Sequence, residues 1–334
     1  MTFPEIAYIN WAKSLPPVAV NLARSGIDLC PPSLLGLRAA DLVATLPVKY
    51  GYAPLREAIA RRYGVEYDRV FPVSGGTSFA NWLACVTALD GCAPGSEVIV
   101  ERPTYEPLIR IPQALGYRVR RFDRRFEDGY AVDLDRFASL VTTKTRLAVV
   151  TNLHNPSGAQ IPVPALRAMA AMLPRVKALL LVDEVYLECL FRSAPESCVH
   201  AGPNVVTTNS LTKAYGLDGL RAGWILGPAP FIARAGRIND LMTNNSVAPG
   251  ERMALAAFRR HRDVDKRAHA ILDPNLVRIR TFLAREPRLR AFVPEGGNVV
   301  FPRLPASVDS DRLVRHLVKH DSTLVVPGRF FEAP

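Results

Sequence analysis

The sequence predicts an α/β fold with a mostly parallel central sheet covered by helices, together with a smaller α+β domain. The first observation behind this prediction is alternation, because short apolar, β-branched segments alternate with stretches of helical periodicity, as in βαβ units. The second is the segment ALLLVDEV, which is apolar without alternation, as expected of a strand buried on both faces. The third is a change near Pro249, where long charged helical segments replace the alternation.

Each predicted strand contains a short run of apolar residues, mainly Val, Ile and Leu. The predicted strands cover residues 69–73, 97–101, 146–151, 178–185, 205–209 and 222–227. Helical spacing of apolar residues predicts helices over 78–89, 105–115 and 163–173. Ligands of such sheets bind at the carboxyl ends of the strands. The residues that follow each predicted strand are therefore the candidates for a functional site.

Three parts are expected along the chain. Residues 1–48 form an N-terminal segment that belongs with the smaller domain, 49–248 form the large domain, and 249–334 form the C-terminal small domain. In the last part, the sequence predicts a long helical stretch through Arg285 that is broken at Pro274, and then a helix over 310–319.

Composition excludes several classes of protein. The 334 residues carry a net charge of +11, but the arginines are scattered in short, interrupted groups, which favours a solvated basic surface over a nucleic-acid footprint. No segment approaches the roughly 18 consecutive apolar residues of a membrane span, and the N-terminus lacks a secretory signal, so we expect a cytoplasmic protein. The five cysteines form no Cys-x-x-Cys pair, so we expect reduced thiols and no metal site.

Glycine-rich and hydroxyl residues follow the first predicted strand. Ser74, Gly75, Gly76 and Thr77 open a predicted helix, where a close backbone approach and the helix dipole favour an anion such as phosphate. Short glycine turns before helices are common in proteins of every function, so this turn alone does not establish a phosphate site.

Further candidates follow the other strands. An acid at the end of a fully buried strand is costly without a positive partner, so Asp183 indicates a cationic ligand group. The candidates at the remaining strand ends are Tyr105, Asn155, Tyr186, Ser210, Lys213 and Arg221. One ligand satisfies them all, namely a flat phosphorylated aromatic aldehyde with a ring nitrogen, which is pyridoxal phosphate. Lys213 would form its Schiff base.

In that arrangement, the phosphate takes the turn from Ser74 to Thr77, with Ser210 as hydroxyl donor and Arg221 as counter-charge. Asp183 keeps the ring nitrogen protonated, so that the ring withdraws electrons from a developing carbanion. Tyr105 stacks on the ring, and Asn155 and Tyr186 hydrogen-bond to its phenolic oxygen.

The order of these motifs resembles the class I/II aminotransferases of pyridoxal phosphate fold type I, which are similar to aspartate aminotransferase. The resemblance covers roughly residues 20 to 328, and the segments that carry it are Tyr-Gly-Tyr-Ala-Pro-Leu-Arg, Ser-Gly-Gly-Thr, Pro-Thr-Tyr, Asn-Pro-Ser-Gly, Asp-Glu-Val-Tyr, Ser-Leu-Thr-Lys and Gly-Leu-Arg-Ala-Gly-Trp. It implies the cofactor contacts given above, a catalytic group of Lys213, Asp183 and Tyr105, and a substrate site that includes Gly26 and Asn155.

The resemblance also implies the reaction. Lys213, released by an incoming amino acid, would move the α-proton as general base, and an amino group would pass from an amino acid to a 2-oxo acid. The enzyme would be a homodimer. The same pocket supports a lyase or a synthase, such as a carbon-sulfur lyase, a decarboxylase or a cyclising enzyme, because the protein selects which bond breaks. A remote alternative is a non-catalytic sensor domain.

Two places depart from the family pattern. The family has a tyrosine that reaches the phosphate of the neighbouring subunit, and here that place lies near Leu46, with Tyr50 as the nearest candidate. The arginine that binds the substrate carboxylate lies beyond the Val-Pro-Gly landmark in the family, past Pro334 of this sequence. We therefore expect either that the small domain is incomplete at its C-terminus or that the carboxylate is bound otherwise. Neither Arg303 nor Arg329 matches the family position.

Overall fold

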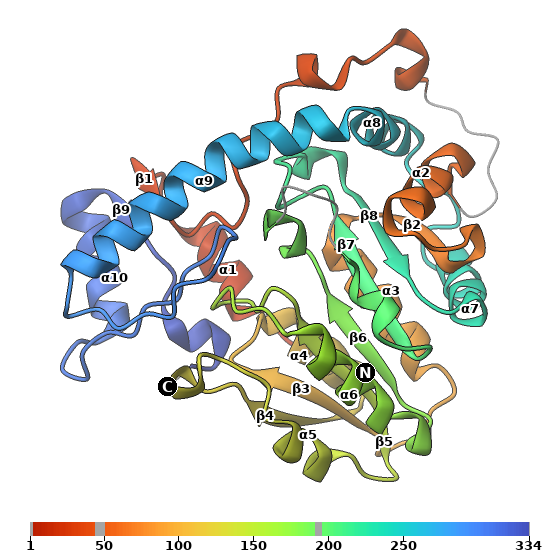
Figure 1. The fold of residues 1–334 in the computed structure, drawn as a ribbon, viewed down its shortest axis with the longest axis horizontal. Helices are drawn as coiled ribbons and strands as arrows, with labels where there is room; N and C mark the ends of the chain where they lie inside the picture. Colours follow the sequence, from red (N-terminus) through yellow and green to blue (C-terminus); the bar gives the residue numbers. More distant parts are fainter. Residues whose placement is uncertain (1–2, 44–50, 191–195, 334) are drawn as a thin grey trace.

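The computed structural model describes residues 3–43, 51–190 and 196–333. Its centre is a seven-stranded sheet in the order β2-β8-β7-β6-β5-β3-β4 (Figure 1). The strands are β2 (Val70–Ser74), β3 (Glu97–Arg102), β4 (Arg118–Asp123), β5 (Thr145–Thr151), β6 (Leu179–Asp183), β7 (Val205–Ser210) and β8 (Ala222–Leu226). All pairs are parallel except those of β8, which runs antiparallel to β2 and to β7. The predicted α/β class with a mostly parallel sheet is confirmed.

Helices cover both faces of this sheet. They are α2 (Ala53–Tyr63), α3 (Gly76–Leu89), α4 (Glu106–Ala114), α5 (Leu134–Leu140), α6 (Val163–Met172) and α7 (Ala229–Asp240). Alternate side chains of one strand enter different cores: Val98 and Val100 of β3 pack with α3, α4 and α7, whereas Ile99 packs with α5 and α6. Burial on both faces accounts for the apolar character of the central strands.

Two predicted boundaries differ from the structure. Strand β6 ends at Asp183, not at residue 185, because the backbone N–H of Val185 turns back to donate to Oδ1 of Asp183 at 3.0 Å. Strand β4 was not predicted, since its sequence RVRRFD is mostly charged. It lies at the sheet edge, where Phe122 is buried and the arginines reach solvent or neighbouring carboxylates.

The predicted helix break at Pro274 is wrong. The C-terminal part contains α8 (Ala248–Arg259), α9 (His261–Arg285), α10 (Ser310–Asp321) and the short strand β9 (Thr323–Leu324), and the interruption falls at Arg260. Pro274 lies within α9 on its exposed side, where water can hydrogen-bond to the carbonyl that the proline leaves without a donor. The long helix therefore continues through it, as Figure 1 shows.

The N-terminal segment contains α1 (Ala7–Ser14) and β1 (Val20–Asn21). Strand β1 pairs in parallel with β9 of the C-terminal part, which supports the proposed grouping of these two segments in one smaller domain. Helix α1 reaches the large domain as well, because the backbone N–H of Tyr8 donates to Oε2 of Glu106 at 2.9 Å. No helix in the described ranges is long and apolar enough to cross a membrane.

Candidate active site

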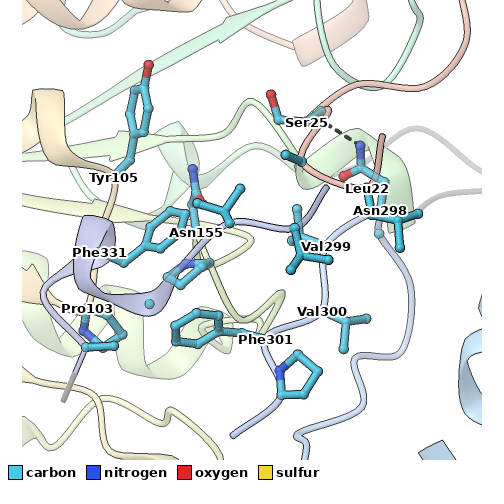
Figure 2. A pocket seen from close by; sticks show the side chains of 18 of the residues that line it. Leu22, Ser25, Pro103, Tyr105, Asn155, Asn298, Val299, Val300, Phe301 and Phe331 are labelled. Carbon is cyan, nitrogen blue, oxygen red and sulfur yellow. Dashed lines mark hydrogen bonds between the residues drawn. The ribbon is translucent and has the colours of Figure 1, made fainter. Parts of the chain in front are cut away.

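One cleft collects most of the predicted site residues. It opens between the carboxyl ends of the sheet strands, the N-terminal segment and the C-terminal part, and Figure 2 shows Ser25, Tyr105, Asn155 and Asn298 on its walls. The predicted residues that line it are Gly26, Thr77, Tyr105, Asn155, Asp183, Tyr186, Lys213 and Arg221. The other predicted residues within the described ranges, Ser74, Gly75, Gly76 and Ser210, do not line it. Tyr50 and Leu46, the candidates for a contact across subunits, lie outside the described residues.

Asp183 and Lys213 form the charged centre of the cleft. Asp183 is 4% exposed, and burial raises the pKa of its carboxyl to about 6, although hydrogen bonds from Asn81 and from the backbone of Val185 oppose the shift. Burial also lowers the pKa of Lys213, while the charge of Asp183 raises it. The two groups thus stabilise each other's charged forms, but desolvation outweighs that attraction at both.

Asn81 forms a hydrogen bond with the carboxylate of Asp183. Its side-chain N–H donates to Oδ2 of Asp183 at 2.7 Å, and Oγ1 of Thr208 donates to Oδ1 of Asn81 at 2.5 Å. The second bond orients the amide so that its nitrogen faces the carboxylate. Asn81 was not predicted from the sequence, although it lies one helical turn after Thr77 on the helix that follows the glycine turn.

The glycine turn is hydrogen-bonded to Arg221. The N–H groups of Gly75 and Gly76 donate to the Arg221 carbonyl at 2.6 and 2.8 Å, and the Arg221 guanidinium donates to the Gly75 carbonyl at 2.5 Å. Arg221 itself adopts a left-handed conformation with φ of 50°, which is strained for a residue with a side chain. The N–H groups of both glycines therefore already have a hydrogen-bond partner within the protein, and the role left to the turn is to leave space for a ligand.

Hydroxyl groups surround the same corner. Oγ1 of Thr77 donates to Oγ of Ser210 at 2.6 Å, and the hydroxyl of Ser210 accepts from the backbone N–H of Thr212 at 3.2 Å. Ser74 lies at the outer end of the turn, where its hydroxyl accepts from the Val247 N–H at 2.9 Å.

The predicted ring contacts, Tyr105, Asn155 and Tyr186, also line the cleft. Tyr105 begins α4, and its ring meets that of Tyr8 edge-on at 6.2 Å. Burial raises the pKa of both Tyr105 and Tyr186 well above the usual tyrosine range, so both are neutral phenols. The backbone N–H of Asn155 donates to Oγ1 of Thr151 at 2.8 Å, which fixes its loop at the end of β5.

Three other polar side chains, two of them the arginines considered above, have structural partners. His154 is fully buried between the Ser157 hydroxyl and the Pro103 carbonyl, and desolvation lowers its pKa, so it stays neutral. Arg303 pairs with Glu127 at 2.5 Å, and Arg329 pairs with Asp311 at 2.9 Å. Among the described residues, no group of three or more His, Cys, Asp or Glu side chains is arranged to hold a metal ion.

Residues 26–334 match the protein family described as aminotransferase class I and II. The chain belongs to the class I and II aminotransferases. Its fold type and its cofactor, pyridoxal phosphate, are those of this family.

Individual relatives of this aminotransferase differ in their reactions. It is 32% identical over 314 residues to capreomycidine synthase of Streptomyces vinaceus, which covers 90% of this chain and 77% of that protein. It is 28% identical over 301 residues to arginine–pyruvate transaminase AruH of Pseudomonas aeruginosa, which covers 84% and 73% of the two chains. The solved structure of a pyridoxal phosphate-dependent cyclase, OrfR, matches all of this chain and 91% of that one with a TM-score of 0.87 and 28% identity.

The geometry of the aminotransferase cleft fits the cofactor. Oγ1 of Thr212 is buried and has no hydrogen-bond partner within the described residues, so it has a free donor for a phosphate oxygen. A Cβ added to Gly76 would stand 3.2 Å from this hydroxyl and 3.2 Å from Nη2 of Arg221, so glycine keeps that corner open. At the other end, burial raises the pKa of Asp183 although Lys213 opposes the shift, so a cationic ring nitrogen beside this carboxyl would stabilise its ionised form.

Proposed function

We propose that this aminotransferase transfers an amino group between an amino acid and a 2-oxo acid, with Lys213 as the residue that holds the cofactor. The observation that carries the proposal is that one cleft holds both half-buried Lys213 and buried Asp183, each with its pKa displaced toward the neutral form. Such pairs of perturbed groups in clefts are typical of catalytic sites.

At the phosphate end, we assign the donors as the hydroxyls of Ser210 and Thr212 and the guanidinium of Arg221, with the Thr77 hydroxyl beside them donating to Ser210. The unpartnered Thr212 hydroxyl and the open corner at Gly76 support this assignment. Gly75 and Gly76 provide space rather than donors, because their amides already bind the Arg221 carbonyl. Ser74 supports the turn through its contact with Val247.

At the ring end, Asp183 would face the ring nitrogen, and Asn155 and Tyr186 would face the phenolic oxygen, with Tyr105 against the ring. When bound, the cofactor supplies an electron-withdrawing ring that stabilises the negative charge left when a bond to the substrate α-carbon breaks. A pyridinium nitrogen would place a positive charge beside Asp183, which would lower the pKa of this carboxyl and stabilise its ionised form.

Lys213 would then move the proton. A base must be neutral to accept a proton, and the lowered pKa of Lys213 increases its neutral fraction at any pH below the usual lysine range. Gly26 lies against the same lysine, with Cα of Lys213 3.8 Å from the position of an added Cβ. We assign Gly26 and Asn155 to the wall beside which the substrate carboxylate would bind.

A second candidate function is cyclisation of an amino acid side chain. It is favoured by the names of two similar proteins, capreomycidine synthase and the cyclase OrfR, one of which covers 90% of this chain. Both reactions use the same lysine and the same electron-withdrawing ring, so the residues near Lys213 do not separate them.

We also infer a homodimer. Leu241, Met242 and Val247 are exposed in the connection between α7 and α8, with Leu241 at 89% exposure, and this connection contacts the glycine turn through Ser74. Exposed apolar groups beside an active site are typical of a subunit interface. Sedimentation should therefore give twice the mass of one chain, and Leu241→Glu combined with Met242→Glu should lower it.

A cytoplasmic location is the inference from thiol chemistry. All five cysteines are free, and four of them are buried. Free thiols persist in reducing compartments, whereas oxidising compartments favour disulfides. Fractionation of the source cells would test this location.

The deciding experiment compares wild type with Lys213→Ala. Purified protein is mixed with pyridoxal phosphate and its visible spectrum is recorded, and then L-arginine, L-glutamate and L-alanine are added singly with pyruvate or 2-oxoglutarate. Wild type should show the band of lysine-bound cofactor that Lys213→Ala lacks, and one pair should give a new amino acid and a new oxo acid. A donor with a leaving group on its side chain, such as a β-hydroxy amino acid, is tested as well, and a ring product that keeps the α-nitrogen, loses that group and needs no oxo acid would favour cyclisation. Absence of the band would overturn both.

A further inference from the structure

Ser25 joins three side chains at the centre of the cleft. Nζ of Lys213 donates to Oγ of Ser25 at 2.5 Å, and the hydroxyl of Tyr186 is hydrogen-bonded to the same serine. The Ser25 carbonyl accepts from Nδ2 of Asn298 at 3.1 Å, which is the dashed contact in Figure 2. A serine hydroxyl has one donor and two acceptor positions, so it can serve Lys213 and Tyr186 together.

The backbone around Ser25 is fixed to the segment that carries Lys213. The N–H of Ile27 donates to the Lys213 carbonyl at 3.3 Å, and the N–H of Cys30 donates to the Gly216 carbonyl at 2.9 Å. The two segments approach so closely that a Cβ at Gly216 would lie 2.1 Å from the Asp28 carbonyl oxygen. The Ser25 hydroxyl therefore has a defined place relative to Nζ.

The Ser25 hydroxyl hydrogen-bonds to side chains that line the cleft. Within the described ranges, its side-chain partners are Lys213 and Tyr186, two residues that we place around the cofactor, and it supports no backbone group. The charges that act on Nζ come from elsewhere, namely Asp183, Asp218 and Arg221. Removing the hydroxyl would leave these charges in place while releasing the end of a flexible four-carbon side chain.

We propose that Ser25 is a positioning residue for Lys213, and that its hydroxyl holds Nζ in the direction of the cofactor whenever the lysine is not bonded to it. This inference rests on the proposed function, since it takes Lys213 as the cofactor lysine. In the free protein, the hydroxyl orients Nζ for attachment. During turnover, it holds the released amine where it can take up the α-proton of the substrate.

The test measures how fast Lys213 attaches to added pyridoxal phosphate in cofactor-free, full-length protein. The Nζ lone pair bonds to the aldehyde carbon, and the aldehyde oxygen leaves as water, so the visible band reports the step directly. The rate is recorded by stopped flow at rising pH until it reaches a plateau, and the plateaus are compared because each variant then reacts through its neutral Nζ. Ser25→Ala should lower this plateau by about 10-fold, as expected when an oriented group is released.

Two further variants separate position from structure. Ser25→Thr retains the hydroxyl and should attach within about twofold of the wild-type rate. Ser33→Ala removes an exposed serine of the same N-terminal segment and should leave the plateau unchanged. With an amino donor that converts the cofactor, Ser25→Ala should also show a larger isotope effect for an α-deuterated donor, because proton transfer becomes slower.

The outcomes distinguish the two proposals. If wild type forms no band, the proposed function fails and Ser25 loses its assigned partner. If wild type forms the band, Lys213→Ala does not, and Ser25→Ala reaches the wild-type plateau, the positioning role is overturned while the proposed function stands. Equal slowing in Ser25→Ala and Ser25→Thr would overturn it as well, because shape rather than the hydroxyl would then matter.

Discussion

Asn81 and Asp183 are joined by a hydrogen bond of 2.7 Å from the amide nitrogen to Oδ2, between side chains that are both buried. This bond opposes the rise in the Asp183 pKa that burial causes, so Asn81 favours the ionised form of the carboxylate. Asn81 carries no charge, so it would influence the proposed contact with the ring nitrogen only through its hydrogen bond to Asp183.

The first prediction concerns this bond. Asn81→Leu should reduce turnover by about 100-fold, because the carboxylate loses its donor and stabilises a positive ring nitrogen less well. Thr208→Val removes only the bond that orients the Asn81 amide and should have a smaller effect. Steady-state assays and the visible spectrum of the loaded protein would measure both, and an unchanged turnover in Asn81→Leu would contradict the assignment.

The second prediction is a pH dependence of stability in the cofactor-free protein. The Asp183 pKa is about 6 in the folded protein and near 3.8 unfolded, so between these values the folded state binds more protons. The free energy of unfolding should therefore fall by about 2 kcal/mol as the pH rises from 4 to 6. Urea unfolding should show this loss in wild type, and the part due to Asp183 should vanish in Asp183→Asn. Identical slopes would refute it.

A third prediction uses two glycines in the segment after Lys213. Gly216 has φ of 65° and no room for a Cβ, whereas a Cβ at Gly219 would meet nothing within 4 Å. Gly216→Ala should destabilise the protein by about 3 kcal/mol or more, since backbone must move and the conformation is strained. Gly219→Ala is the matched control and should change stability by less than about 0.5 kcal/mol. Thermal unfolding of the pair would measure the difference, and equal melting temperatures would disprove the close contact with Asp28.

The fourth prediction concerns the buried pair of Glu101 and Arg124. Both side chains are fully buried, Nη1 to Oε2 is 2.9 Å, and Oε1 of Glu101 accepts from both the N–H and the hydroxyl of Thr151 at 2.6 Å. Glu101→Gln should destabilise the protein by about 3–5 kcal/mol, because it leaves the arginine buried without a counter-charge.

The same substitution should disturb the active site, since Thr151 also holds the backbone of Asn155. The exposed pair of Arg125 and Asp128 provides the control, and Arg125→Ala should leave stability nearly unchanged. Urea denaturation would compare them. Similar losses from the two substitutions would show that burial does not set the strength of the Glu101 pair.

The amino-acid sequence by itself determined the order of the main strands and the residues at their carboxyl ends. These features are local, because a continuous apolar segment has few places in a soluble fold other than a buried strand, and an acid at its end requires a partner. Asp183, Lys213 and Arg221 could therefore be proposed as site residues in advance, and they line one cleft. The resemblance in motif order led to the family that the comparison then confirmed.

Only the tertiary structure decided which residues support that centre. Asn81 meets Asp183 across 102 positions of sequence, and Ser25 meets Lys213 across 188 positions. Neither residue is unusual in its own segment, so local patterns could not single them out. The same limit explains β4 and the helix break at Arg260, where sheet pairing and solvent exposure overrode the local signals of charge and proline. Contacts between distant segments, not residue types, complete this site.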